Sequence, residues 1–434
     1  MPTQHQLAPP RRLPILYLGF AHLSLLVAAS VAAFDPVSIT GFYYHPRMIG
    51  VVHLVTLGWI TGSIIGALFI VGPLALRTPI PVRRIDYWAY GFFTIGVVGM
   101  VSHFWIEQYS GMAWSAGMVL AAFVQIVVRV ARPLVSAPLP RAIPLHVILA
   151  MANLIGAATI GVLVGIDRDV DVMPGTTLPN VYTHAHLAGV GWATLMVLGV
   201  GYRMLPMVLP SAMPTGPRLT ASALLVEVGV IGLAASLFFG RTPLPFALLV
   251  CNGLALFLIN VRWMFQHRRP PPTELPRPDW GGRQAVQALA YLGCTATLGL
   301  YLASAPTTVW SARLAMLYGV LGLLGFLAQI VVGIEHRLLP LFQWHTTVQK
   351  DGWSNETPSP HAMGSQAYRS GIYWLWTVAV PLLAVGLSVE QASLVRVGGL
   401  CLLSAAALQT HQARLILRSR THSHVGAPAT QVAR

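Results

Sequence analysis

Twelve long apolar segments divide this chain, and each is long enough to cross a membrane. They lie at about 14–34, 46–76, 87–105, 110–132, 143–166, 183–209, 218–240, 243–265, 284–304, 310–340, 370–388 and 393–418. A helix needs roughly 20 apolar residues to span the bilayer core. Because only 9% of the 434 residues are charged and 55% are hydrophobic, a soluble domain is excluded. The sequence predicts an all-α integral membrane protein with twelve transmembrane helices in one domain, residues 1–434.

The charged residues alternate between the two ends of the predicted helices. Arginines crowd one set of connections, and most acidic residues lie in the opposite set. This positive-inside bias predicts that both termini are cytoplasmic. We expect the membrane to be a bacterial inner membrane. The basic residues that give the net charge of +14 therefore orient the chain and contact lipid headgroups. No nucleic-acid partner is expected. The first apolar run is too long for a cleavable signal and is expected to remain as the first helix.

A motif rich in glycine occurs three times, on the second, sixth and tenth predicted helices. Its copies run over 53–73, 186–206 and 325–340. The first two begin 133 residues apart (186 − 53), and the last two end 134 residues apart (340 − 206). This period corresponds to about four membrane helices. It predicts three pseudo-symmetric four-helix repeats at about 14–132, 143–265 and 284–418, with one longer cytoplasmic loop at about 341–369.

Five histidines lie near the outer ends of predicted helices two, three and six: His45, His53, His103, His184 and His186. An unpartnered imidazole in hydrocarbon costs several kcal/mol, so each ring needs water, a hydrogen bond or a metal. For one histidine a hydrogen bond is the simpler interpretation, whereas the set favours metal or haem ligation. Residues two apart on a helix point about 200° apart. His184 and His186 are therefore expected to serve two adjacent sites.

Several other polar or aromatic residues have structural interpretations. His22, inside the first helix, is expected to bond to a neighbouring helix. His146 and His336 are expected at cytoplasmic helix ends, where their rings either reach the interface or pair with the helix end. Trp59, Trp192 and Tyr182 are either lining residues of a pocket or, more simply, membrane-interface aromatics. The three cysteines have no Cys-x-x-Cys spacing and are expected to pack as small apolar residues.

One stretch of the sixth helix resembles a known family. It contains Thr183, His184, Ala185, His186, Gly191, Trp192, Ala193, Tyr202, Arg203 and Pro206. It is similar to subunit I of the haem–copper oxygen reductases and nitric oxide reductases, especially the cbb3-like branch. The NnrS type of membrane haem and copper protein has a similar build. The resemblance implies twelve helices in three groups of four, histidine-ligated redox centres near the outer side, a haem b and copper.

The chain departs from this family at two of its metal-ligand positions. Helix ten carries no His-x-His in its outer half, and Arg218–Gly240 has no histidine pair for copper. Matching helix six here to the family's helix ten instead predicts a pocket among helices two, three and six. His184 or His186 would be an axial haem ligand, and His53 with His103 and His45 would surround the open face as copper ligands.

The ligand set determines the function that is expected. An open haem face would bind or reduce a diatomic gas (O₂ or NO), as an oxidase or nitric oxide reductase does. Two axial histidines, for example His53 and His186, would transfer electrons only. The electron donor would be a cytochrome c or a cupredoxin. The alternatives are an NnrS-like role in the nitric oxide response or copper handling, and a cofactor-free twelve-helix transporter. A transporter is expected to have acidic residues in its helices, of which Glu227 is the only clear one.

Overall fold

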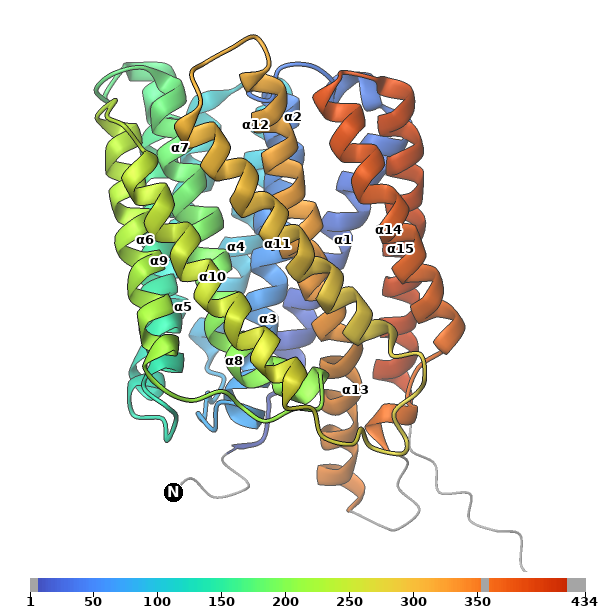
Figure 1. Ribbon diagram of the computed structural model, residues 1–434. Coiled ribbons are helices and arrows are strands. Elements are labelled where there is room, and N and C mark those ends of the chain that lie inside the picture. The colour runs from blue at the N-terminus through green and yellow to red at the C-terminus, as the bar shows by residue number, and fades with distance from the viewer. Residues whose placement is uncertain (1–6, 353–358, 420–434) are drawn as a thin grey trace, which may run out of the picture.

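The computed structural model describes residues 7–352 and 359–419, which fold into one helical bundle (Figure 1). Within these ranges twelve helices are long and apolar enough to cross a membrane. The same residues contain no β-strand, only an isolated bridge between Ser211 and Arg268. The predicted all-helical class and the twelve spans are therefore confirmed, and a multi-pass membrane protein whose outer helices contact lipid follows from them.

Nine of the spans in the described chain are single α-helices, and three are composite. The single helices are α1 (Arg12–Phe34), α4 (Arg84–Ile106), α5 (Tyr109–Val135), α6 (Ala142–Val170), α9 (Pro217–Phe238), α10 (Leu244–Gln266), α11 (Trp280–Ser304), α14 (Gln366–Ser388) and α15 (Ala392–Arg418). The composite spans are α2 (Pro46–His53), η3 (Leu54–Thr61) and α3 (Gly62–Leu74); α7 (Thr177–His186), η4 (Leu187–Thr194) and α8 (Leu195–Val208); and α12 (Ser311–Val320), η5 (Leu321–Ala328) and α13 (Gln329–Asp351). Short 3₁₀ turns, η2 (Pro36–Ile39) and η6 (Pro360–Ala362), lie outside the spans.

The three composite spans are the ones that carry the sequence motif, and each contains a π-helical segment, η3, η4 or η5. These segments begin at Leu54, Leu187 and Leu321, 133 (187 − 54) and 134 (321 − 187) residues apart. π-Helical turns are rare and occur frequently at functional sites. The hydrophobic pattern of the sequence does not reveal these segments, because a π-helical turn leaves an apolar run unchanged. Their recurrence agrees with three repeats, although the pseudo-symmetry itself stays a prediction.

The motif glycines bring each composite span close to the helix that precedes it. The pairs are Gly58 with Ser24 of α1, Gly191 with Asn153 of α6, and Gly325 with Tyr291 of α11. At Gly191, a Cβ atom would lie within 2.7–2.8 Å of the Asn153 side chain. Glycine is therefore required at this position for packing, since any larger residue would displace a neighbouring helix or side chain.

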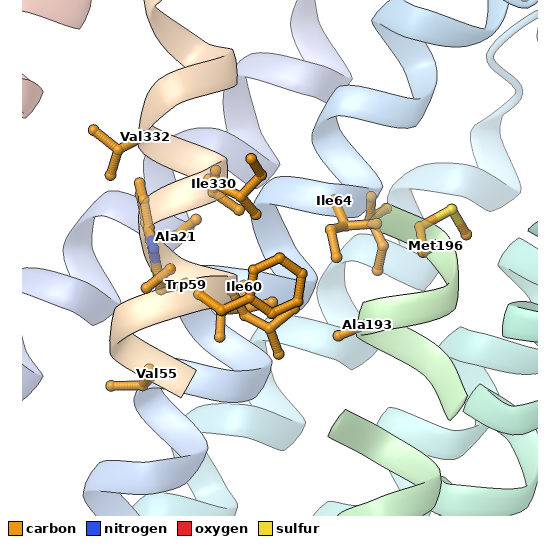
Figure 2. Close-up of a cluster of buried hydrophobic side chains, with 14 of the residues drawn as sticks. Ala21, Val55, Trp59, Ile60, Ile64, Ala193, Met196, Ile330 and Val332 are labelled. Atoms are coloured by element: carbon orange, nitrogen blue, oxygen red, sulfur yellow. The ribbon is translucent and has the colours of Figure 1, made fainter. Parts of the chain in front are cut away.

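The composite spans form the interior of the bundle, and the single helices surround them. The most apolar stretch of the span Pro46–Leu74 is 83% buried, and that of each of the other two composite spans is 61% buried. The corresponding share is 50% or less in the single helices. Ile64 of α3, Met196 of α8 and Ile330 of α13 gather in one apolar cluster (Figure 2). Helix α1 packs against α15, so the first and last spans are neighbours and close the outer ring (Figure 1).

Helix α13 continues further than the sequence predicted. It runs to Asp351 and extends beyond the lower edge of the bundle (Figure 1). The predicted 341–369 loop is therefore too long, because its first part is helical. His336 consequently lies inside a helix and not at its end.

For four side chains the interfacial interpretation is wrong for one physical reason: these residues face the bundle interior. His336 is 5% exposed and His146 is 0% exposed, so neither ring reaches an interface. Trp59 is 0% exposed and Trp192 is 3% exposed, so neither is an interfacial aromatic. Trp192 Nε1 instead donates to Thr61 Oγ1 of η3 at 3.1 Å. A single sequence cannot distinguish such side chains from interfacial ones, because the helix face that they occupy depends on packing.

Candidate functional site

The histidines singled out by the sequence lie at one end of the bundle, on three of its spans. His53 is the last residue of α2, and His186 is the last residue of α7, so each directly precedes a π-helical segment. His184 lies two residues earlier on α7. His103 is in the last turn of α4, and His45 is the exposed N-cap residue of α2. The composite spans therefore position three of the five rings next to backbone that is not regular α-helix.

His53 and His184 form a pair across two spans. Their rings are 20° from parallel, and the ring centroids are 6.4 Å apart. His53 Nδ1 donates to the Ile49 carbonyl at 2.8 Å, and His184 Nδ1 donates to the Ala157 carbonyl of α6, also at 2.8 Å. Because a carbonyl only accepts, each Nδ1 carries the proton and each neutral Nε2 keeps a lone pair.

The tautomer of this pair is the one that metal-binding histidines adopt. Such histidines usually donate one ring N–H to a carbonyl or carboxylate and bind the metal through the other nitrogen. Neither Nε2 atom has a hydrogen-bond partner within the described ranges. Both rings therefore have one nitrogen fixed by backbone and one available as a ligand.

Neighbouring residues hold the two rings in place. The Phe104 ring of α4 lies 5.3 Å from the His53 ring, at 28° to it. On the other side of the pair, Gly161 of α6 accommodates the His184 ring, since a Cβ atom there would lie 2.8 Å from His184 Cε1. The orientation of His184 therefore depends on α6 both through the Ala157 carbonyl and through this glycine.

His186 faces a different part of the bundle, as the two-residue spacing predicts. Its Nδ1 donates to the Tyr182 carbonyl at 2.8 Å. Its Nε2 lies 3.5 Å from the Tyr318 hydroxyl of α12, and the two rings are 6.0 Å apart and 25° from parallel. The partner of His53 is therefore His184. The sequence had suggested His53 and His186 as an example of two axial ligands.

The histidines proposed for copper do not converge in this structure. His103 donates from Nδ1 to the Gly99 carbonyl of its own helix at 2.6 Å, and its ring packs against Gly111 of α5. His45 is exposed and makes no side-chain cap bond. In the described chain, no three His, Cys, Asp or Glu side chains are grouped so as to hold a metal ion. A copper ion bound by His45, His53 and His103 stays a prediction, and the separate positions of these three side chains do not favour it.

Two imidazoles are a donor set that fits haem. Protein zinc and copper sites take three or four ligands from the chain. Haem iron already has four porphyrin nitrogens and takes only one or two axial ligands from the protein. The His53–His184 pair, with both Nε2 atoms available, meets that requirement and falls short of the number needed for a closed copper or zinc site.

A second polar group, not predicted from the sequence, lies inside the bundle. Glu335 of α13 is 4% exposed, and its Oε2 lies 3.5 Å from His22 Nε2 of α1. Glu227 is thus not the only acidic residue within the described spans. The sequence signal that could have identified Glu335 was the presence of an acidic residue inside the apolar run 310–340. His22 does bond to a neighbouring helix, as predicted, through its Nδ1 to Thr410 Oγ1 of α15 at 3.0 Å.

No protein-family model matches the chain, and no curated protein matches it. The residues and their geometry are therefore the basis for the function of this chain.

Proposed function

We propose that this chain is a haem-binding integral membrane redox protein in which His53 and His184 are the axial ligands of a haem. The observation that carries the proposal is the pairing of these rings, each fixed at Nδ1 by a backbone carbonyl with Nε2 available. The chain has three cysteines and no Cys-x-x-Cys-His motif, so the haem would not be covalently attached, and the resemblance implies the b type.

Two axial histidines favour electron transfer over gas chemistry. A bound haem would supply one-electron redox chemistry, and imidazole on both faces leaves no position for O₂ or NO. The site lies at the end of the bundle that the positive-inside rule assigns to the outer side. A cytochrome c or a cupredoxin on that side would be the electron donor, and both termini would lie in the cytoplasm of a bacterium. The proposal keeps the resemblance to haem–copper oxidase subunit I and NnrS-type proteins, but it gives the haem two axial histidines.

The test is an optical spectrum of the detergent-purified protein, reduced with dithionite and compared with the oxidised form, together with a pyridine haemochrome assay and copper analysis. We expect one b-type haem per chain whose spectrum does not change when CO is added. A spectrum that shifts with CO or NO would replace electron transfer by gas binding or reduction at an open face. Protein purified with no haem, from cells that supply haem, would overturn the proposal.

One observation favours a second function, a cofactor-free transporter. The buried contact between Glu335 and His22 supplies the intramembrane acid that the sequence interpretation lacked. The haem spectrum separates the two functions, because only the redox protein needs the cofactor. Transport would then be tested by proton uptake into vesicles that contain the purified chain.

A further inference from the structure

Glu335 lies where a carboxylate is costly. It belongs to the interior span α13 and is 4% exposed. Its Oε2 accepts a hydrogen bond from Gln409 Nε2 of α15 at 2.6 Å and lies 3.5 Å from His22 Nε2 of α1. His22 itself is 6% exposed and lies about half-way along α1. A buried charge needs a compensating partner or a proton, and an ionisable residue inside a membrane is by default functional.

The hydrogen bonds of His22 determine where its own proton lies. Thr410 has a single hydroxyl proton, which it donates to the Ala406 carbonyl at 2.7 Å. The Thr410 oxygen must therefore accept from His22 Nδ1, 3.0 Å away. With its proton on Nδ1, the neutral imidazole has a lone pair on Nε2. That lone pair faces Glu335 Oε2, so two acceptors oppose each other unless a further proton lies between them.

We propose that His22 and Glu335 share one exchangeable proton and form a proton-binding site in the membrane interior. In the form of the pair that holds this proton without separated charges, the proton is on Glu335, because a carboxylic acid beside a neutral imidazole places no charge in hydrocarbon, whereas the ion pair places two. When the acid gives up the proton to His22 Nε2, the products are a carboxylate and an imidazolium. No proton is gained or lost in that step.

The neighbouring arginines are engaged elsewhere: on α13 itself, Arg337 pairs with Asp279 at 2.6 Å. His336, also on α13, packs against Gly281 of α11, and both of its ring nitrogens are buried without a partner within the described ranges. Arg369 of α14 donates to the Met363 carbonyl at 2.6 Å. On α8, which also packs on α13, Arg203 donates to the Ala75 carbonyl at 3.0 Å. The other contacts of the pair are neutral: Gln409, Thr410 and Trp59, whose ring lies 5.2 Å from that of His22.

Glu335 also borders an apolar cavity. This cavity of about 90 Å³ lies among α3, α8 and α13. Glu335 Oε1 and Ser63 Oγ, which also belongs to the lining, are buried without a partner within the described ranges. Ile64, Met196 and Ile330 form part of the apolar wall (Figure 2).

The test is carbodiimide labelling of the full-length protein in detergent, followed by peptide mapping. Dicyclohexylcarbodiimide reacts with protonated carboxyls in apolar surroundings: the acid proton moves to a carbodiimide nitrogen, and the carboxyl oxygen bonds to the central carbon. We expect an adduct on the wild-type peptide that contains Glu335, and its loss in Glu335→Gln. Glu227→Gln is the matched control, because Glu227 is half-buried on α9 and accepts from Asn153 Nδ2 at 2.7 Å. This control should keep the Glu335 adduct.

An infrared spectrum supplies a second measurement that needs no chemical probe. The wild type should have a carboxylic-acid C=O band that shifts in D₂O, disappears in Glu335→Gln and persists in Glu227→Gln. The band should change position in His22→Asn, because the acid loses the ring nitrogen that accepts from it. An unlabelled Glu335, together with a band that Glu335→Gln leaves intact, would overturn the proposal. Neither measurement depends on haem, so the proton site and the proposed function can fail separately.

Discussion

His53 and His184 hold their rings 20° from parallel and 6.4 Å apart, although they are 131 residues apart in the chain (184 − 53). Their Nδ1 atoms are fixed by different means. His53 bonds to a carbonyl of its own helix, whereas His184 bonds to Ala157 on α6. The geometry of the pair therefore depends on how three spans pack and not on any local motif. Such fixed orientation is what a preorganised ligand pair needs.

Removing either member of this pair should remove the haem. We expect His53→Ala and His184→Ala each to lower the ratio of haem to protein about tenfold or more, because an axial ligand contributes at least as much as the residues that orient it. The measurement is a pyridine haemochrome assay on purified protein.

His103→Ala is the control, since His103 lies at the same end of the bundle and also bonds to a carbonyl of its own helix, that of Gly99. It should keep its haem. Full haem content in both His53→Ala and His184→Ala would contradict the assignment of these ligands.

The sequence predicted the architecture well and the side-chain partners poorly, and the reason is physical. Long apolar runs identify spans because every span must satisfy its own backbone in lipid. The π-helical segments, the pairing of His53 with His184 and the burial of Glu335 depend on contacts between spans far apart in sequence. His186 shows the limit most directly: the motif places it beside His184, but only packing directs it to Tyr318.

Two glycines of η4 should respond oppositely to the same substitution. A Cβ atom at Gly191 would lie within 2.7–2.8 Å of Asn153, which is buried and donates to Glu227, whereas Gly189 has open space around its Cβ position. Gly191→Ala should destabilise the protein by about 1–3 kcal/mol through overpacking. Gly189→Ala should be neutral or stabilise by about 0.5–1 kcal/mol, because alanine loses less backbone entropy in a helix. Denaturation in a series of detergent mixtures measures both, and equal effects would argue against close packing at Gly191.

The hydrogen bond between Trp192 and Thr61 should stabilise the contact between two composite spans. Thr61→Val keeps the shape of the side chain but removes the oxygen that accepts from Trp192 Nε1 at 3.1 Å. Leaving this N–H unpaired in the interior should cost about 1 kcal/mol. Thr56→Val in the same segment, η3, is the matched control, because Thr56 donates only to the Val52 carbonyl of its own span. In thermal unfolding in detergent, Thr61→Val should have a lower Tm than Thr56→Val. The reverse order would mean that this hydrogen bond contributes nothing to stability.

The orientation of the bundle should be measurable at the two ends of α11. Pro272 and Thr307 are exposed residues in the loops before and after this helix. The arginines on the Pro272 side assign that loop to the cytoplasm. In a chain whose three native cysteines are replaced by alanine, Thr307→Cys should react with a membrane-impermeant maleimide on intact spheroplasts. Pro272→Cys should react only after lysis. The opposite pattern would place both termini outside and move the His53–His184 pair to the cytoplasmic side, where neither a cytochrome c nor a cupredoxin of the outer compartment could reach it.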